Sequence, residues 1–391
     1  PLARFAEGFA DELSQVGYTS FSTRDLLGVV AHFSRWLQDQ GLEAGDVDEA
    51  VAERFLAARR AAGYRWHRRL ASLVPLLAYL RRLGVIAPPS AATAQTPTER
   101  ELERFRKYLL TERGLTPASA KDYVSLVRPF VADRVGTAGV DPARATSGEV
   151  NAFLVAATSR LGAKTVQRSA SALRALLRFW HLDGVLSVPL AEAVPKVAHR
   201  APQLPRGLPP EQVAAMLASC DTGRVDGLRD RAMMLLMARL GLRCGEVAAL
   251  RLEDIDWRAG QVSVRGKGGR RDLLPLPVEV GQAIADYLQA GRPATAIGRT
   301  VFVRVLAPHR ALSSTGVTQA VAAAARRAGL GTVYGHRLRH SAATAMLAAG
   351  GSLTEIGQVL RHRRPATTAI YARVDVEALR TLARPWPRAR S

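Results

Sequence analysis

Two clusters of histidine and arginine near the C-terminus are followed by a single tyrosine. "GHRLRH" contains His336 and Arg339, and "VLRHRR" contains Arg361 and His362, shortly before Tyr371. Cations around a phenol can stabilise its phenolate, the ionised form of a group whose ordinary pKa is about 10. Arginine also suits phosphate, because its planar fork meets two phosphate oxygens at once and stays charged. These residue types therefore suit chemistry on a phosphate.

A metal site is the first alternative. His336 and His340 are four residues apart, the spacing of a zinc-protease helix, but that motif needs glutamate at its second position. Arg337 occupies this position and would place a cation beside the metal. The two cysteines, Cys220 and Cys244, form no zinc-site spacing with histidine. We therefore predict no zinc site.

Two further cations stand upstream of these clusters. Arg243 follows a hydrophobic stretch at a predicted turn, where it could cap a helix or pair with Glu246 or Asp254. Lys267 lies in "RGKGGR", at the tip of a predicted hairpin. It does not belong to a phosphate-binding loop, because Gly268 stands where serine or threonine is required. Each cation, taken alone, is typical of a solvated surface.

The order Arg, Lys, His-x-x-Arg, His and then Tyr resembles the catalytic signature of the tyrosine recombinase (phage integrase) family. The matching stretches are "GLRCGEVAALRLEDIDW", "VRGKGGRRDLLPLP", "HRLRHSAATAMLAAGGSLTEIGQVLRH" and "ATTAIYARV", within about residues 205–380. The last two are the most specific, because several residues recur at fixed spacings. The resemblance implies a site-specific DNA recombinase that cleaves and rejoins strands through a covalent 3′-phosphotyrosine intermediate.

By this resemblance, Tyr371 is the nucleophile, and Arg243 and Arg339 clamp the phosphate. Attack on a phosphodiester places negative charge on the nonbridging oxygens, and preorganised cations lower that barrier. The covalent linkage stores the bond energy, so rejoining needs no ATP. Tyr334 is a rival nucleophile, but it precedes the motif and lacks the family spacing, and a buried core position is the alternative for it.

The resemblance assigns the remaining roles as well. Lys267 supplies the proton for the departing sugar hydroxyl, and His336 donates a hydrogen bond beside the phosphate or acts as a base. His362 contacts a nonbridging oxygen, and Glu246 orients Arg243 or the histidines. The arginines take the place of magnesium, so the resemblance implies no metal and no other cofactor.

One position departs from the family pattern. Leu-Gly-His usually precedes the tyrosine helix, and here Arg361 replaces the glycine. A positive φ at this position would cost arginine about 1 kcal/mol. We expect an ordinary backbone instead, with Arg361 contacting a DNA phosphate. Arg168 and Arg270 are also predicted to contact DNA.

The composition agrees with a polyanionic partner. Lys and Arg outnumber Asp and Glu by 55 to 34, which gives a net charge of +21. Nucleic acid is the commonest partner of such a protein, although an Arg-rich proteome is an alternative source of the charge. Apolar residues make up 48% of the chain, enough for a packed core. The apolar run "AMMLLMA" is too short to span a membrane, and "PLARFAEGFADEL" lacks a signal-peptide layout. We expect a cytoplasmic, nucleoid-associated protein, processed before Pro1.

Proline-rich joints divide the chain into three segments. Residues 1–90 and 99–188 show helical spacing throughout, and they align with each other at an offset of 100 residues. We predict two all-helical domains, of which the first duplicates the second. The domain at 99–188 resembles the core-DNA-binding domain of the tyrosine recombinase family, and this resemblance implies that the first domain binds DNA ends or arm sites. Chance similarity between amphipathic helices is the alternative.

The third segment, residues 200–385, is predicted to be the catalytic domain, followed by a basic tail at 386–391. Alternation in "GQVSVRG" and "RRDLLPLP" predicts a hairpin, and "RTVFVRV" is a candidate edge strand. The fold class is thus mainly α with a small antiparallel β-sheet.

Three functions remain open. The first is a recombinase that acts on double-stranded DNA sites as a homotetramer, or with other recombinases, to integrate, excise or transpose a mobile element. The second is a type IB-like topoisomerase, which shares the chemistry. The third is a catalytically silent DNA-binding accessory protein, against which the complete residue set argues.

Overall fold

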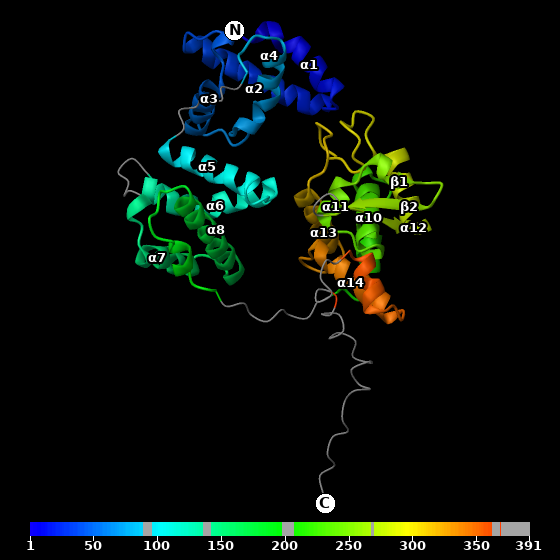
Figure 1. The fold of residues 1–391 in the computed structure, drawn as a ribbon. Coiled ribbons are helices and arrows are strands. Elements are labelled where there is room, and N and C mark those ends of the chain that lie inside the picture. The colour runs from blue at the N-terminus through cyan, green and yellow to red at the C-terminus, as the bar shows by residue number, and fades with distance from the viewer. Residues whose placement is uncertain (89–95, 136–141, 198–206, 267–269, 362–367, 369–391) are drawn as a thin grey trace, which may run out of the picture. The chain divides into compact units, whose positions relative to one another are not determined.

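A computed structural model describes residues 1–88, 96–135, 142–197, 207–266, 270–361 and 368. Over these residues the chain is mostly helical and has one three-stranded antiparallel sheet, so the predicted fold class is confirmed (Figure 1). The chain divides into two compact units, Pro1–Pro88 with Gln203–Ser391 and Pro89–Pro202. No helix in the described ranges has the length and apolarity that crossing a bilayer requires.

The first two segments share an order of four α-helices with a 3₁₀ turn between the second and the third. The first has η1 (Ala3–Phe5), α1 (Ala6–Gln15), α2 (Ser20–Asp39), η2 (Ala44–Asp46), α3 (Glu49–Ala61), η3 (Leu70–Ser72) and α4 (Val74–Arg82). The second has α5 (Pro97–Thr111), α6 (Pro117–Val135), η4 (Pro142–Arg144), α7 (Ser147–Thr158), α8 (Ala163–Leu182) and η5 (Leu190–Ala193). In both, two helices precede a 3₁₀ turn and two more helices follow it.

The starts of several of these helices are set by side-chain caps. The side chain of Thr19 accepts a hydrogen bond from the main chain of α2, as do Asp48 for α3, Thr96 for α5 and Thr146 for α7. Such caps satisfy main-chain N–H groups that a helix leaves unpaired at its first turn. The local sequence therefore determines where these helices begin.

The cores of the two segments support the predicted duplication. The apolar positions of α4 and α8 that match at an offset of 100 residues are buried in both: Leu73, Leu76, Leu77, Tyr79, Leu173, Leu176, Leu177 and Phe179. Each set belongs to its own hydrophobic cluster. The duplication stays a prediction, and so do the predicted domain boundaries.

The two copies differ at the start of their last helix. α8 begins at Ala163, whereas α4 begins only at Val74. Pro75 lies in the first turn of α4, and proline there would interrupt any helix arriving from upstream. The sequence predicted a helix in both segments upstream of the position of Pro75. In the second segment this region is part of α8, whereas in the first segment it precedes α4.

The third segment builds the sheet and the helices around it. Its elements are α9 (Pro210–Ala218), α10 (Val225–Arg239), α11 (Cys244–Ala249), η6 (Leu252–Asp254), β1 (Ile255–Asp256), β2 (Gln261–Arg265), β3 (Arg271–Pro275), α12 (Val278–Asp286), the π-helical turn η7 (Tyr287–Gly291), α13 (Ser314–Arg327), α14 (Gly335–Ala348) and α15 (Leu353–Val359).

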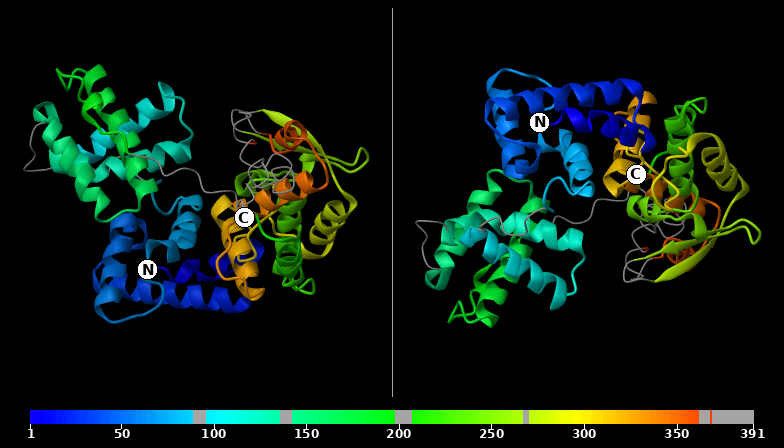
Figure 2. Two further views of the ribbon diagram at one scale, coloured as in Figure 1. Left: turned by 90° about the horizontal axis from the view of Figure 1, so that it is seen from below. Right: turned by 90° about the horizontal axis from the view of Figure 1, so that it is seen from above.

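Helix α10 forms the centre of this segment. Its residues from Ala232 to Ala238 are all buried, and it contacts α11, α12, α13 and α14 (Figures 1 and 2). A helix that is apolar on every side must be covered on every side. The "AMMLLMA" run is thus the axis around which the helices of the candidate site are packed.

The predicted hairpin is confirmed, and the predicted edge strand is wrong. β2 pairs with β3 so that Val262 faces Leu274 and Val264 faces Asp272. The third strand is β1, at the other edge of β2. The "RTVFVRV" stretch instead donates from Val301 N to Leu250 O and forms isolated bridges outside the sheet. Its consecutive residues Val301, Phe302 and Val303 are all buried, whereas a strand directs successive side chains to opposite faces.

Candidate active site

Glu246 holds Arg243 at the start of α11. The main-chain N–H of Arg243 donates to Glu246 Oε2 at 2.8 Å, and Arg243 Nη1 donates to Glu246 Oε1 at 2.6 Å. The Glu246 side chain is 8% exposed and the Arg243 side chain 48% exposed. A buried carboxylate therefore orients a guanidinium that stays open to solvent.

The structure corrects the backbone predicted at Arg361. Its φ is 55°, the left-handed conformation. Arg361 follows the C-cap residue of α15, a position where helices commonly end in this conformation and where glycine is usual. The expectation of an ordinary backbone is wrong, and the conformation costs arginine about 1 kcal/mol.

The side chain of Arg361 turns inward. Its Nη2 donates to Glu246 Oε2 at 2.7 Å and its Nη1 to the Val359 carbonyl at 2.9 Å. The residue is 5% exposed. The DNA phosphate contact predicted for Arg361 is untested, and the contacts in the structure favour a different role, as a partner of Glu246.

Two guanidiniums thus share the Glu246 carboxylate. Burial raises the pKa of Glu246. The hydrogen bond from the Arg243 main chain and the charge of Arg361 lower the pKa by more than burial raises it, so that it lies below its ordinary value of 4.5. Glu246 is therefore a carboxylate at neutral pH. This agrees with the prediction that it orients Arg243, which stays a prediction for the reaction.

Arg339 links three separate segments of the chain. It projects from α14, is 6% exposed, and donates from Nη1 to the Gly241 carbonyl and from Nη2 to the Leu360 carbonyl. Gly241 has a φ of 62°, and a Cβ there would collide with Leu360. Arg339 therefore fastens the turn just before Arg243 to the residue just before Arg361.

Helix α14 begins beside α11. Gly335 is buried, and a Cβ on it would collide with Cys244 Sγ and Met237 Cε. Because this close approach requires glycine, the first turn of α14 lies against the residue that follows Arg243. His336, in that turn, is exposed. The structure thus brings Arg243, His336 and Arg339 to one region of the third segment.

Tyr334 is not a buried core residue, contrary to the alternative considered for it. It is 52% exposed, and its ring stacks on His336 with centroids 6.1 Å apart. It lies directly before α14 as the N-cap residue, in an extended conformation. Its accessibility makes it a suitable control for the nucleophile.

His340 is a feature that the sequence analysis considered only as a metal ligand. Its ring lies edge-on to that of His336, with centroids 5.9 Å apart. Burial, followed by the charges of His336 and Arg339, lowers the pKa of His340. It is therefore a neutral imidazole at pH 7. The i, i+4 spacing of the two histidines could have predicted this contact.

The other predicted site residues lie elsewhere or outside the described residues. Lys267, His362 and Tyr371 fall outside the ranges that the structure describes. Arg270 is at the base of the β2–β3 turn, 58% exposed and 3.0 Å from Asp272. Arg168 is on α8, 48% exposed and paired with Asp122. Among the described residues, no three His, Cys, Asp or Glu side chains gather where they could hold a metal.

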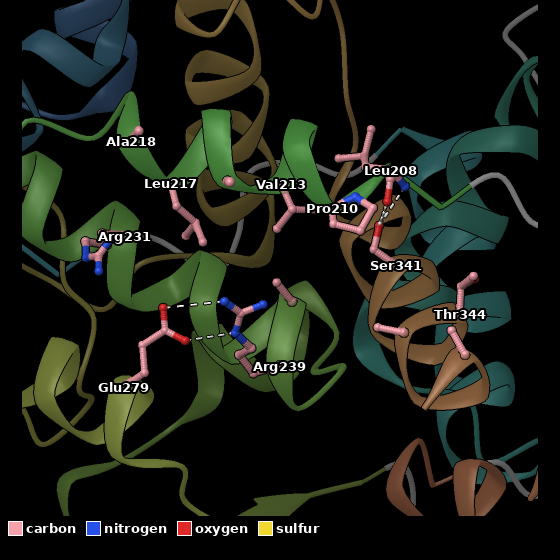
Figure 3. Close-up of a pocket in the computed structure, with 14 residues that line it drawn as sticks. Leu208, Pro210, Val213, Leu217, Ala218, Arg231, Arg239, Glu279, Ser341 and Thr344 are labelled. Carbon is pink, nitrogen blue, oxygen red and sulfur yellow. Dashed lines mark hydrogen bonds and ion pairs between the residues drawn. The ribbon is translucent and has the colours of Figure 1, made fainter. Parts of the chain in front are cut away.

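A groove of about 600 Å³ lies on another face of α14 (Figure 3). It is lined by apolar side chains of α9 and α10 and by Ser341, Thr344 and Ala345 of α14, with the Arg239–Glu279 ion pair on one wall. At 3.6 residues per turn, these positions lie mainly on the opposite side of α14 from His336 and Arg339. The groove is therefore not the site described above.

Comparisons with known proteins show the family of this chain. The model of the "Phage integrase family" matches residues 206–378, and that of the "Phage integrase, N-terminal SAM-like domain" matches residues 102–182. The integrase/recombinase y4rA of Sinorhizobium fredii is 39% identical over 392 residues, which cover 99% of this chain and 95% of that protein. The chain belongs to the phage integrase family. The predicted resemblance is thus confirmed, and the chain is a tyrosine recombinase, a site-specific DNA strand-exchange enzyme.

Other members of the family match more distantly. The tyrosine recombinase XerD of Mycobacterium tuberculosis is 34% identical over 307 residues, which cover 74% of this chain and 98% of XerD. A lambda integrase dimer bound to a COC′ core site has a TM-score of 0.55 at 17% identity, covering 74% of this chain and 98% of that one. XerH bound to palindromic difH has a TM-score of 0.55 at 18% identity, covering 75% and 98%. The last two show a shared fold.

Glu246→Gln in this recombinase is expected to lower the free energy of unfolding by about 3 kcal/mol at pH 7, because it leaves the buried Arg361 guanidinium without its carboxylate. The depressed pKa means that the carboxylate stabilises the fold fully above about pH 4.5, and that this contribution is lost as the pH falls through the pKa of the folded state. Urea unfolding from pH 7 down to pH 3, with hydrogen exchange at α11 as a local readout, measures this. The difference between the two proteins should shrink toward acid, and a constant difference would contradict the charge assignment.

Proposed function

We propose that this recombinase cleaves DNA through a covalent 3′-phosphotyrosine intermediate on Tyr371. The Tyr371 phenol gives up its proton as its oxygen attacks phosphorus, the bond from phosphorus to the 5′-oxygen breaks, and the departing 5′-oxygen takes up a proton and leaves as a hydroxyl. Attack by the 5′-hydroxyl of another strand reverses these steps, releases the tyrosine and joins the strands. The overall exchange conserves the number of phosphodiester bonds.

The observation that carries this proposal is the convergence of Arg243, His336 and Arg339. The Arg243 side chain is half-exposed and is paired with the buried Glu246 carboxylate. His336 is exposed in the first turn of α14. Arg339 donates to the carbonyls of Gly241 and Leu360, and so joins the chain just before Arg243 to the chain just before Arg361. We assign Arg243 and Arg339 to the nonbridging oxygens, whose charge grows in the transition state. His336 donates a hydrogen bond to the same phosphate, and His362 is proposed as a further donor.

We propose that Lys267 protonates the leaving 5′-oxygen, and that Arg168 and Arg270 contact the DNA backbone. Arg270, at the base of the turn that holds Lys267, is well exposed. Arg168 is half-exposed on α8, within the match to the SAM-like domain. The net charge of +21 supports binding to a polyanion.

Lys267→Ala is expected to slow cleavage of an ordinary strand by about 100-fold, because general acid catalysis contributes at least that much. A strand with sulfur in place of the 5′-oxygen should be cleaved at nearly the wild-type rate, since a thiolate leaves without protonation. Single-turnover cleavage of both substrates tests this, with Arg270→Ala as the control from the same hairpin. Equal slowing of both substrates would remove Lys267 from the acid role.

We further propose that the recombinase acts as a tetramer on two DNA sites and moves a mobile element, in the cytoplasm and at the nucleoid. The full-length relative, which shares the first segment as well, is named an integrase/recombinase, whereas XerD aligns with only 74% of the chain. A lambda integrase tetramer bound to a Holliday junction has a related fold, with a TM-score of 0.53. By analogy, the first segment would bind DNA outside the exchange site.

A nicked substrate that loses the leaving strand tests the central proposal, because it traps any covalent protein–DNA adduct. We expect a stable adduct whose digestion yields a peptide containing phosphorylated Tyr371. Paired sites in a junction assay then separate recombination from topoisomerase activity. Relaxation of supercoils without strand exchange would contradict recombination, and the absence of any adduct would contradict the chemistry.

A further inference from the structure

Arg361 occupies a position that the backbone makes unfavourable for it. With a φ of 55°, it is one of two described non-glycine residues with a positive φ. Glycine would adopt this conformation without strain, and glycine is the residue usual in the family at this point. The side chain must therefore contribute something that glycine lacks.

The contacts of Arg361 show what that contribution is. Its guanidinium is buried and reaches Glu246, which is 115 residues earlier in the chain, at 2.7 Å. Glu246 already holds Arg243 through its other oxygen at 2.6 Å and through the Arg243 main chain at 2.8 Å. One carboxylate thus balances two guanidiniums, and the cluster of three side chains carries a net charge of +1.

The charge of this cluster decides how Arg243 can act. If Glu246 were paired with Arg243 alone, the pair would be neutral, and the carboxylate would compete with a phosphate for the guanidinium. Because Arg361 pairs with the same carboxylate inside the protein, its positive charge compensates part of the negative charge of Glu246. Arg243 then keeps a positive field directed outward while it stays oriented.

We propose that Arg361 is a positioning residue for strand cleavage. It acts through Glu246, which it holds in place and partly neutralises, so that Arg243 remains available to the scissile phosphate. This inference rests on the proposed role of Arg243, but it concerns a side chain that bonds to Glu246 and Val359 and need not touch DNA.

Arg361→Gly removes the side chain without changing the backbone, because glycine adopts the left-handed conformation readily. The variant therefore measures the effect of the side chain alone. We expect single-turnover adduct formation to slow about 10-fold, less than the roughly 100-fold or more for losing a direct contact to the transition state. The DNA dissociation constant should stay within about 2-fold of wild type, since no phosphate contact is lost. Arg361→Lys should recover part of the rate, because it restores a cation near Glu246 without the guanidinium fork.

A double-mutant cycle with Glu246→Gln tests whether Arg361 acts through Glu246. Once Glu246 is neutral, Arg361→Gly should slow cleavage by less than about 2-fold further. Arg229→Gln is the matched control, because Arg229 is also buried and bonded to a carboxylate, that of Asp230 at 2.7 Å, away from the site. This control should lower stability and leave the cleavage rate of the folded protein unchanged.

The inference would be overturned by wild-type cleavage by Arg361→Gly, or by an unchanged 10-fold loss when Glu246 is already glutamine. A fall in DNA affinity that matches the fall in rate would also overturn it, since that is the signature of a phosphate contact. A wild-type protein that forms no adduct would instead contradict the proposed chemistry, so the two failures are distinguishable.

Discussion

Tyr371→Phe is expected to abolish covalent adduct formation, with a loss of about 10⁴-fold or more. Phenylalanine keeps the ring and removes only the hydroxyl that would attack phosphorus, and removing a nucleophile commonly costs this much or more. DNA affinity should stay within about 2-fold of wild type, because a single hydroxyl adds little to the many phosphate contacts of such a protein. Adduct trapping on a nicked substrate and gel-shift titration measure the two quantities.

Tyr334→Phe is the matched control for this experiment. Tyr334 is half-exposed and stacks on His336, so it is the accessible tyrosine that the structure places beside a predicted site residue. Its hydroxyl should be dispensable, and the variant should form adduct at a rate within a few-fold of wild type. If Tyr334→Phe lost the adduct and Tyr371→Phe kept it, the assignment of the nucleophile would be reversed.

Arg243→Ala is expected to slow cleavage by about 1,000-fold while changing the DNA dissociation constant by only a few-fold. The guanidinium would meet charge that exists fully only in the transition state, so its loss acts on the rate far more than on binding. Single-turnover cleavage at saturating DNA, with a separate binding titration, distinguishes the two effects. Equal loss of rate and affinity would make Arg243 an ordinary phosphate contact.

Arg239→Ala is a close control for this variant. Arg239 lies four residues earlier, is 45% exposed, and pairs with Glu279 at 2.9 Å, much as Arg243 pairs with Glu246. Its replacement removes the same side chain and the same charge from the surface of the same segment. We expect near wild-type cleavage, so that general loss of positive charge cannot explain the effect at position 243.

Arg339→Ala should reduce cleavage by a similar factor, but for two combined reasons. It removes a predicted clamp residue, and it frees the carbonyls of Gly241 and Leu360, to which Arg339 donates. A lower unfolding temperature is therefore expected for this variant and not for Arg243→Ala. Arg243→Ala is consequently the cleaner test of the phosphate clamp.

The sequence predicted the elements of the fold wherever a local rule applies. Alternation and glycines predicted the β2–β3 hairpin, and its register is the one that buries Val262 and Val264. The strand predicted for "RTVFVRV" does not form, because the consecutive residues Val301, Phe302 and Val303 are all buried in the core and the stretch makes only isolated bridges. The sequence contains Pro75, yet its helical spacing alone did not show that α4 would begin at Val74, with this proline in its first turn.

By itself the sequence determined the family and enzyme class of this protein, and it predicted Arg243, His336 and Arg339 as site residues, because their order and spacing are properties of the chain. Only the tertiary structure decided how these side chains are used. Arg361 reaches Glu246 across 115 residues, and Arg339 reaches Gly241 across 98. Such partners depend on how α10, α11, α14 and α15 pack together, since a guanidinium near a helix end can face DNA or a buried carboxylate with the same local sequence. Packing and the turn after α15 directed Arg361 inward, where a carboxylate offsets the cost of burying its charge.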